Sequence, residues 1–447
     1  MSTRHRLVRR HAGLSAAAAA AALFLASGWS GCVDVFQPPG NDNTGDNDNT
    51  GDGKYGNSSD PTNRSAAYIT SSACRECHAD ISAKQLVHGH AHKLTRVQGA
   101  PPSFPEEGAR AGVPEPPEGF EWADIAYVIG GYTRKGRFID NDGFILTDGV
   151  NGVNTQWNLS FPANGTQPGF VAYESDRATP KPYDFSCFQC HTTGARAQNE
   201  DFPEFQENRP GFAGTWEEAG VQCEACHGPG GNHFATRDGQ VEIDTTGIFV
   251  KTTAERCGQC HTRGADPNVI LAAGGYIQHH EQWPELLASG GHAGFDCTIC
   301  HDPHVSANYD RDNAIRNECT SCHRDQTMAL HQGKVFVRGE YVEALSCESC
   351  HMTFATKSGS AATAEVVGPN GRMGDTRTHV FRISTSPQDY TSFFTEDLAQ
   401  VRKDSAGRAA VTVDFVCLRC HNGVGNAFSL ELQAAASVAD DMHEVRE

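Results

Sequence analysis

Sixteen cysteines stand in pairs separated by two residues, and a histidine directly follows every pair. Cys-x-x-Cys-His is the covalent attachment site of a c-type haem, in which the two thiols bind the porphyrin and the histidine coordinates the iron. Eight such motifs in 447 residues are too many to be coincidence. We number them 1 to 8 in chain order: Cys74, Cys77 and His78; Cys187, Cys190 and His191; Cys223, Cys226 and His227; Cys257, Cys260 and His261; Cys297, Cys300 and His301; Cys319, Cys322 and His323; Cys347, Cys350 and His351; Cys417, Cys420 and His421.

Two other uses of paired cysteines explain the pattern less well. Disulfides would account for an even number of cysteines in an exported protein, but cysteines two residues apart close poorly and need no following histidine. Zinc sites also use Cys-x-x-Cys, yet they leave eight histidines unexplained. The sequence therefore predicts eight covalently attached haem c groups, each with its iron.

Each iron needs a sixth ligand or keeps an open position. Without the eight motif histidines and the two near the N-terminus, eleven of the 21 histidines remain, and adjacent ones form eight groups. Few methionines are left to compete as ligands. We predict bis-histidine ligation at most haems. The predicted sixth ligands are His90, His233, His280, His292, His304, His331 and His379. His443 is left out, since a solvated residue near a frayed terminus explains it nearly as well.

The composition also limits the fold and the partners. Hydrophobic residues make up only 38% of the chain, and 46 residues are glycine, so haem groups must supply much of the apolar volume. We expect a multihaem cytochrome c fold, mostly irregular, with short α-helices wrapped round stacked haems. A net charge of −19 argues against nucleic acid and is compatible with a basic redox partner or bound cations.

The N-terminal part is typical of an exported protein. Residues 1–31 combine a basic start with an alanine-rich apolar stretch and predict a signal peptide. Cys32 follows small residues and resembles the lipidated cysteine of a bacterial lipobox, although Trp29 replaces the usual leucine. Ordinary cleavage near Ser30 with a free thiol is the alternative. Residues 32–66 are rich in Asn, Asp and Gly and predict a flexible tether, since their calcium-loop pattern is incomplete.

The remaining chain is divided by the motifs. We expect an octahaem domain over residues 67–428, with an insertion at 93–186 between motifs 1 and 2. Asn141-Asp-Gly143 and Asn164-Gly165 each lie between apolar runs and predict two β-hairpins in a small β subdomain. Residues 429–447 have apolar residues at helical spacing and predict a C-terminal helix with Ser429 as its N-cap.

Longer segments resemble the cytochrome c-554 type of multihaem cytochrome, and the wider group with octahaem hydroxylamine oxidoreductases and tetrathionate reductases. The matching segments are Cys74 to Ala91, Cys187 to Gly194, Gly220 to His233, His292 to His304 and Gly374 to Arg382. The resemblance implies stacked, mostly bis-histidine haems, with His90, His233, His292, His304 and His379 as sixth ligands. The chain departs from this group in two ways: no motif ends in lysine, and the last tyrosine, Tyr390, precedes the final motif.

These observations favour a protein that transfers electrons through its haems to other redox proteins or a terminal acceptor. It would be exported to the periplasm or cell surface and anchored through a lipid at Cys32. The alternative is a periplasmic oxidoreductase that acts on a small nitrogen or sulfur oxyanion at one five-coordinate haem. A third hypothesis is a filament in which the next subunit donates a sixth ligand.

Overall fold

The computed structural model describes residues 62–237, 240–250 and 253–443. The predicted signal peptide, Cys32 and the tether up to residue 61 lie outside the described residues. No helix within the described ranges has the length and apolar character needed to cross a membrane.

The helices are short, from four to eight residues. Many of them begin at or next to a haem-attachment motif, where one helical turn is enough to place both cysteines. They are α1 (Thr70–Arg75), α2 (Ala79–Leu86), α3 (Asp148–Asn151), α4 (Phe185–Phe188), α5 (Cys223–His227), α6 (Ala254–Gly258), α7 (Gln282–Leu287), α8 (Arg311–Ala314), α9 (Cys319–Cys322), α10 (Cys347–His351), α11 (Ala364–Val367), α12 (Val413–Val416) and α13 (Leu432–Ala439).

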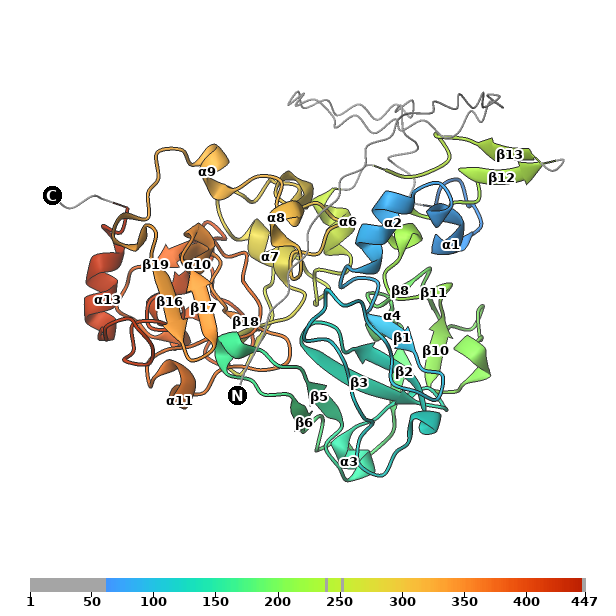
Figure 1. The fold of residues 1–447 in the computed structure, drawn as a ribbon, viewed down its shortest axis with the longest axis horizontal. Helices are drawn as coiled ribbons and strands as arrows, with labels where there is room; N and C mark the ends of the chain where they lie inside the picture. Colours follow the sequence, from blue (N-terminus) through green and yellow to red (C-terminus); the bar gives the residue numbers. More distant parts are fainter. Residues whose placement is uncertain (1–61, 238–239, 251–252, 444–447) are drawn as a thin grey trace, which may run out of the picture. The chain divides into compact units, whose positions relative to one another are not determined.

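A nine-stranded sheet occupies the region between motifs 1 and 3 (Figure 1). Its main path runs β1-β2-β3-β4-β7-β10-β9, and β5 joins β3 to β6. Its strands are β1 (Leu94–Arg96), β2 (Ile125–Gly130), β3 (Lys135–Asp140), β4 (Phe144–Ile145), β5 (Gln156–Asn158), β6 (Gly169–Val171), β7 (Lys181–Asp184), β9 (Arg196–Ala197) and β10 (Phe212–Thr215).

Both predicted hairpins are present in this sheet. Ile139 of β3 pairs with Ile145 of β4 in antiparallel register, and Gly143 turns the chain between them at a φ of 91°. Such a positive φ strains any residue with a side chain. Trp157 of β5 pairs with Phe170 of β6 across the turn at Gly165.

The remaining strands form small sheets beside the motifs. They are β8 (Thr192–Thr193) with β11 (Glu218–Ala219), β12 (Phe234–Arg237) with β13 (Gln240–Ile243), β14 (Ala272–Ala273) with β15 (Tyr276–Gln278) and β18 (Thr356–Lys357), β16 (Val335–Arg338) with β17 (Tyr341–Ala344), and β19 (Ile383–Ser384) with β20 (Val411–Thr412). The sequence therefore underestimated the strands: the β structure extends well beyond a small hairpin insertion, because β10 pairs in parallel with β7 across motif 2.

The buried apolar residues form five clusters. One fills the sheet around Tyr127, Tyr183 and Phe212, and another surrounds Phe393 and Phe415 near motif 8. A divided core of this kind agrees with the low hydrophobic content. The prediction of Ser429 as N-cap is wrong: α13 begins at Leu432 with Glu431 as N-cap.

Candidate haem-binding sites

Each haem-attachment motif folds as a single helical turn. The backbone N–H of the histidine donates to the carbonyl of the first cysteine at 2.9 Å in His78, His261, His301, His323 and His421, whereas His191 donates to the Phe188 carbonyl at 3.1 Å. Residues at i, i+3 and i+4 share one face of a helix. The turn therefore presents both thiols and the imidazole to the same side, as attachment of a planar group requires.

The cysteines of the motifs are all free thiols in the structure. Within the described residues, no group of three or more His, Cys, Asp and Glu side chains is arranged to hold a metal ion. A zinc site needs four such ligands around one ion.

Every motif histidine faces a second histidine from elsewhere in the chain. The ring centroids of the pairs are about 6 Å apart, the separation expected when one ion bonds to both imidazoles at about 2 Å. The pairs are His78–His233 at 6.4 Å, His191–His280 at 6.3 Å, His227–His304 at 6.1 Å, His261–His90 at 6.0 Å, His301–His379 at 6.1 Å, His323–His292 at 5.8 Å, His351–His443 at 5.7 Å and His421–His331 at 5.9 Å.

The seven predicted sixth ligands all lie opposite a motif histidine. Sequence reasoning missed His443, whose ring is nearly parallel to that of His351, at 10°. Its Nδ1 lies 2.7 Å from the carbonyl of Thr327, so contacts distant in sequence hold it in place. The count of eight histidine groups for eight motifs was the signal that could have found it.

His280 has two possible partners. Its ring is 6.3 Å from His191 and 5.6 Å from His261, while His90 also faces His261. Pairing His90 with His261 and His280 with His191 uses each ring once. His280 has a φ of 66°, a conformation that costs energy for a residue other than glycine and that is concentrated at functional sites.

Hydrogen bonds to carbonyl oxygens orient several of these rings. A carbonyl can only accept, so Nδ1 carries the proton and Nε2 keeps the lone pair that binds a metal. The Nδ1–O distances are 2.8 Å for His227 and Phe249, 2.7 Å for His351 and Phe381, 2.9 Å for His421 and Phe428, and 2.9 Å for His233 and Asp244. The pairs thus fit a group whose iron takes a ligand on each face.

Hydrogen bonds also show which motifs are neighbours. Thr70 N donates to Glu224 between motifs 1 and 3 (2.9 Å), and Arg256 donates to the Ala225 carbonyl between motifs 3 and 4 (2.8 Å). Motif 4 also contacts motif 2 through Cys260 Sγ and the Gln189 carbonyl (3.7 Å), and motif 5 through Ala254 N and Asp296 (2.9 Å). Further along, Asn317 and the Ile299 carbonyl join motifs 5 and 6 (2.6 Å), Arg311 joins motifs 6 and 7 by binding Glu318 (2.9 Å) and Glu348 (2.6 Å), and Arg419 and the Ser349 carbonyl join motifs 7 and 8 (2.8 Å). The motifs therefore follow the order 1-3-4-5-6-7-8. Motif 2 contacts motif 4 and, through Gln222 N and Thr193 Oγ1 (2.8 Å), also motif 3, while His304 beside motif 5 faces His227 of motif 3.

The thiols of neighbouring motifs are close enough to influence one another. Contact with the Cys223 thiol of motif 3 raises the pKa of Cys74 in motif 1. Burial and the Cys257 thiol of motif 4 raise the pKa of Cys226 to about 11. Motif 4 thus meets motifs 2, 3 and 5, and we call it the junction.

Four cationic side chains surround His191 of motif 2. Burial, with Lys93, Lys135, Arg137 and Arg263 acting in the same direction, lowers the pKa of His191 to about 3. Arg263 Nη1 lies 3.2 Å from Nε2 of His279. We call Lys93, Lys135, Arg137 and Arg263 the cation cluster. Burial lowers the pKa of Lys93 and of Lys135, so an anion bound beside them would favour their charged forms.

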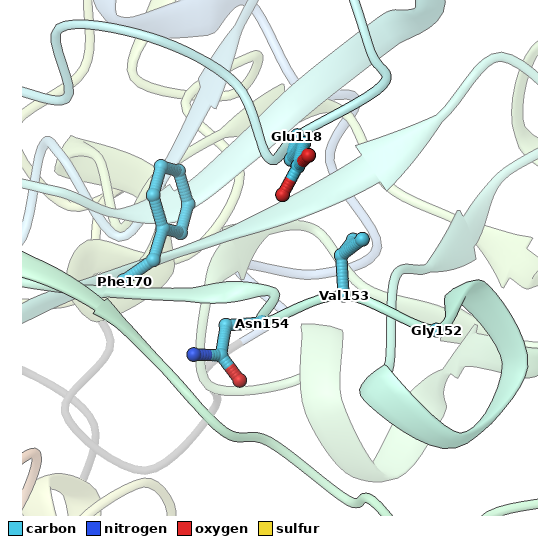
Figure 2. Close-up of a pocket in the computed structure, with 5 residues that line it drawn as sticks. All are labelled: Glu118, Gly152, Val153, Asn154 and Phe170. Carbon is cyan, nitrogen blue, oxygen red and sulfur yellow. The ribbon is translucent and has the colours of Figure 1, made fainter.

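One surface pocket is lined by residues that belong to none of the haem-attachment motifs. Glu118, Gly152, Val153, Asn154 and Phe170 surround it, and Figure 2 shows the Glu118 carboxylate and the Phe170 ring at its edge. These lining residues include no thiol and no imidazole. The pocket therefore takes no part in the arrangement of the motifs.

Comparisons with known proteins agree with this geometry. The sequence family described as "Cytochrome c554 and c-prime" matches residues 171–228. The dissimilatory sulfite reductase MccA of Wolinella succinogenes is 24% identical over 209 residues, which are 38% of this chain and 27% of that protein. The multihaem cytochrome MtrA of Shewanella baltica is 29% identical over 141 residues, 30% of this chain and 35% of that protein. The chain thus spans about a third or less of these curated relatives.

A solved structure has a similar fold. The octahaem sulfite reductase MccA of Wolinella succinogenes superposes with a TM-score of 0.52 at 18% identity, over 84% of this chain and 71% of that one. This likeness supports the predicted multihaem cytochrome fold. Together with the repeated Cys-x-x-Cys-His motifs, the comparisons identify the chain as a multihaem c-type cytochrome.

Proposed function

We propose that this chain conducts electrons through eight covalently attached haems, each held between two histidines. The observation that carries this proposal is the one-to-one pairing of eight motif histidines with eight others at about 6 Å. When bound, each haem supplies one-electron chemistry at its iron. With a histidine held on each side, an iron would have no coordination position left for a substrate, so such a site would transfer electrons and would not transform a bound molecule.

The chain's own residues would set the path and the environment of the haems. The hydrogen bonds between motifs hold their attachment sites side by side in the order 1-3-4-5-6-7-8. Carbonyl acceptors such as Phe249 O and Phe381 O fix ring orientation and raise the basicity of the imidazole ligands. Electrons would enter near one end of this series and leave near the other, with the octahaem domain extending over residues 67–428.

Export and partners follow from the same assignment. Covalent haem attachment takes place on exported chains, and residues 1–31 have the composition of a signal peptide. A lipid at Cys32 would anchor the protein to a membrane, and residues 32–66 would serve as the tether. The net charge of −19 favours redox partners with a basic contact surface. Alternatively, the chain would pass its electrons directly to a terminal electron acceptor.

The pair of His443 and His351, which the sequence did not predict, offers a test of the pairing. Replacing His443 with Ala removes the ring opposite His351, so one haem of eight should change from low-spin to high-spin in the electron paramagnetic resonance (EPR) spectrum. His92 gives a matched control, because its Nε2 bonds to the Leu86 carbonyl at 2.7 Å and it faces no motif histidine. H92A should leave all haems low-spin. An unchanged spectrum for H443A would rule out this pairing.

A second function is favoured by the cation cluster. Motif 2 lies beside the main series, and Arg137 and Arg263, with Lys93 and Lys135 in their charged forms, would stabilise an anion beside its iron. A sulfite reductase among the similar proteins points to the same class of substrate. In this alternative His280 leaves the iron of motif 2 open, and the chain is an oxidoreductase for a small nitrogen or sulfur oxyanion.

A further inference from the structure

The junction histidine is held differently from the other motif histidines. Nδ1 of His261 lies 2.8 Å from the side-chain Oε1 of Gln282. The corresponding acceptors for His227, His351 and His421 are backbone carbonyls. Among the motif histidines in the described ranges, only His261 has a side-chain oxygen as its Nδ1 acceptor. Its environment can therefore be changed by substitution without altering the backbone.

Several contacts fix Gln282 against the ring of His261. Gln282 is the first residue of α7, and the N–H of its neighbour Trp283 donates to the carbonyl of His261 at 3.1 Å. The indole of Trp283 packs so closely on Gly258 of α6 that a Cβ at Gly258 would collide with it. The N–H of Glu285 donates to the Glu281 carbonyl at 2.9 Å and closes the first turn of α7. These contacts of α7 with motif 4 thus fix the position of Gln282 beside the His261 ring.

The hydrogen bond between Gln282 and His261 matters because of the position of motif 4 among the other motifs. Motif 4 touches motifs 2, 3 and 5, so the junction haem lies on a direct route between the two ends and on a route toward motif 2. The ferric or ferrous preference of the junction haem then decides how readily electrons pass in each direction. A hydrogen bond to the far nitrogen of an axial histidine is one of the means by which a protein adjusts that preference.

We infer that Gln282 is a positioning residue that sets the reduction potential of the haem at the junction through its hydrogen bond to His261. This inference rests on the proposed function, which places His261 on that iron. The amide oxygen withdraws the Nδ1 proton partway and makes Nε2 a stronger donor, which stabilises ferric iron. A carboxylate at the same place accepts a stronger, charge-assisted hydrogen bond. An apolar side chain accepts none.

Two substitutions should therefore shift one potential in opposite directions. In Q282E, one of the eight haems should become at least tenfold harder to reduce at a given potential, a shift of 59 mV to the negative side. In Q282L, the same haem should become easier to reduce. The measurement is a potentiometric titration followed by visible absorbance and EPR, which assigns the shifted haem by its g-values.

A matched variant separates the hydrogen bond from simple charge. Gln259 lies exposed in motif 4 and its Oε1 accepts from Arg256 at 2.9 Å, so Q259E adds the same charge to the same motif without touching His261. Q259E should leave the junction potential near its original value. Equal shifts in Q259E and Q282E, or unchanged potentials in both Gln282 variants, would overturn the inference. A high-spin junction haem in the unsubstituted protein would instead refute the proposed function.

Discussion

Removing the junction haem is expected to slow electron transfer between the two ends of the protein. In C257A/C260A the covalent attachment at motif 4 is lost, and with it the haem between motifs 3 and 5 in the series. Haem content should fall by one eighth in a pyridine haemochrome assay. Electron transfer from an electrode or donor at one end to an acceptor at the other should slow markedly, because the haem that contacts motifs 2, 3 and 5 is lost and motifs 3 and 5 keep only their contact through His227 and His304.

The matched variant is C187A/C190A, which removes the side-branch haem instead. It also loses one eighth of the haem, but motif 2 lies off the main series, so conduction between the ends should persist. A spectroelectrochemical measurement of reduction kinetics compares the two variants directly. If both variants conduct equally, or both fail, the branched order of the motifs is refuted.

A second large effect is expected at a buried ion pair between motifs 7 and 8. Arg419, only 1% exposed, lies inside motif 8 and binds both carboxylate oxygens of Glu343 at 2.7 and 3.2 Å. Arg377 binds the same carboxylate at 3.0 Å. E343A leaves the Arg419 guanidinium buried without its partner, a loss of about 3–5 kcal/mol of folding free energy. The melting temperature by circular dichroism should fall accordingly.

An exposed ion pair supplies the control. Glu318, 52% exposed, binds Arg311 at 2.9 Å, and E318A should cost about 1 kcal/mol or less. A similar loss of stability in both variants would contradict the role of burial at Glu343.

The same carboxylate predicts how stability depends on pH. Burial alone would raise the pKa of Glu343, but Arg419 and Arg377 outweigh it and lower the pKa from 4.5 to about 2. A depressed pKa in the folded state means that the stabilisation is complete above pH 4.5 and is lost as the pH falls toward 2. Acid denaturation of the unsubstituted protein should therefore show a steep decline between these values that E343A lacks.

The sequence predicted the haem-attachment residues because that chemistry depends on local spacing. Cys-x-x-Cys-His needs only one helical turn, and the Asn-Gly and Asp-Gly turns of the two hairpins are equally local. Sixth ligands were recognisable as a set from the surplus of histidines. The motif that each sixth ligand faces could not be predicted, because only the folded chain brings His233 to motif 1 and His90 to motif 4.

Other features depend on contacts between residues far apart in the sequence, which local sequence patterns do not indicate. His443 resembled a solvated terminal residue, yet the Thr327 carbonyl orients it toward motif 7. The nine-stranded sheet exceeds the predicted insertion because β10 returns after motif 2 to pair with β7. The cation cluster combines Lys93 and Lys135 with Arg263 from well beyond the insertion, so its members meet only in three dimensions.

The central claim is that every iron lies between two histidines, and EPR of the oxidised, fully haem-loaded protein tests it most directly. The account predicts eight low-spin ferric haems, with a spectrum that stays the same when sulfite or nitrite is added. A high-spin signal equal to one haem, altered by either anion, would contradict the account and assign oxyanion chemistry to the branch at motif 2.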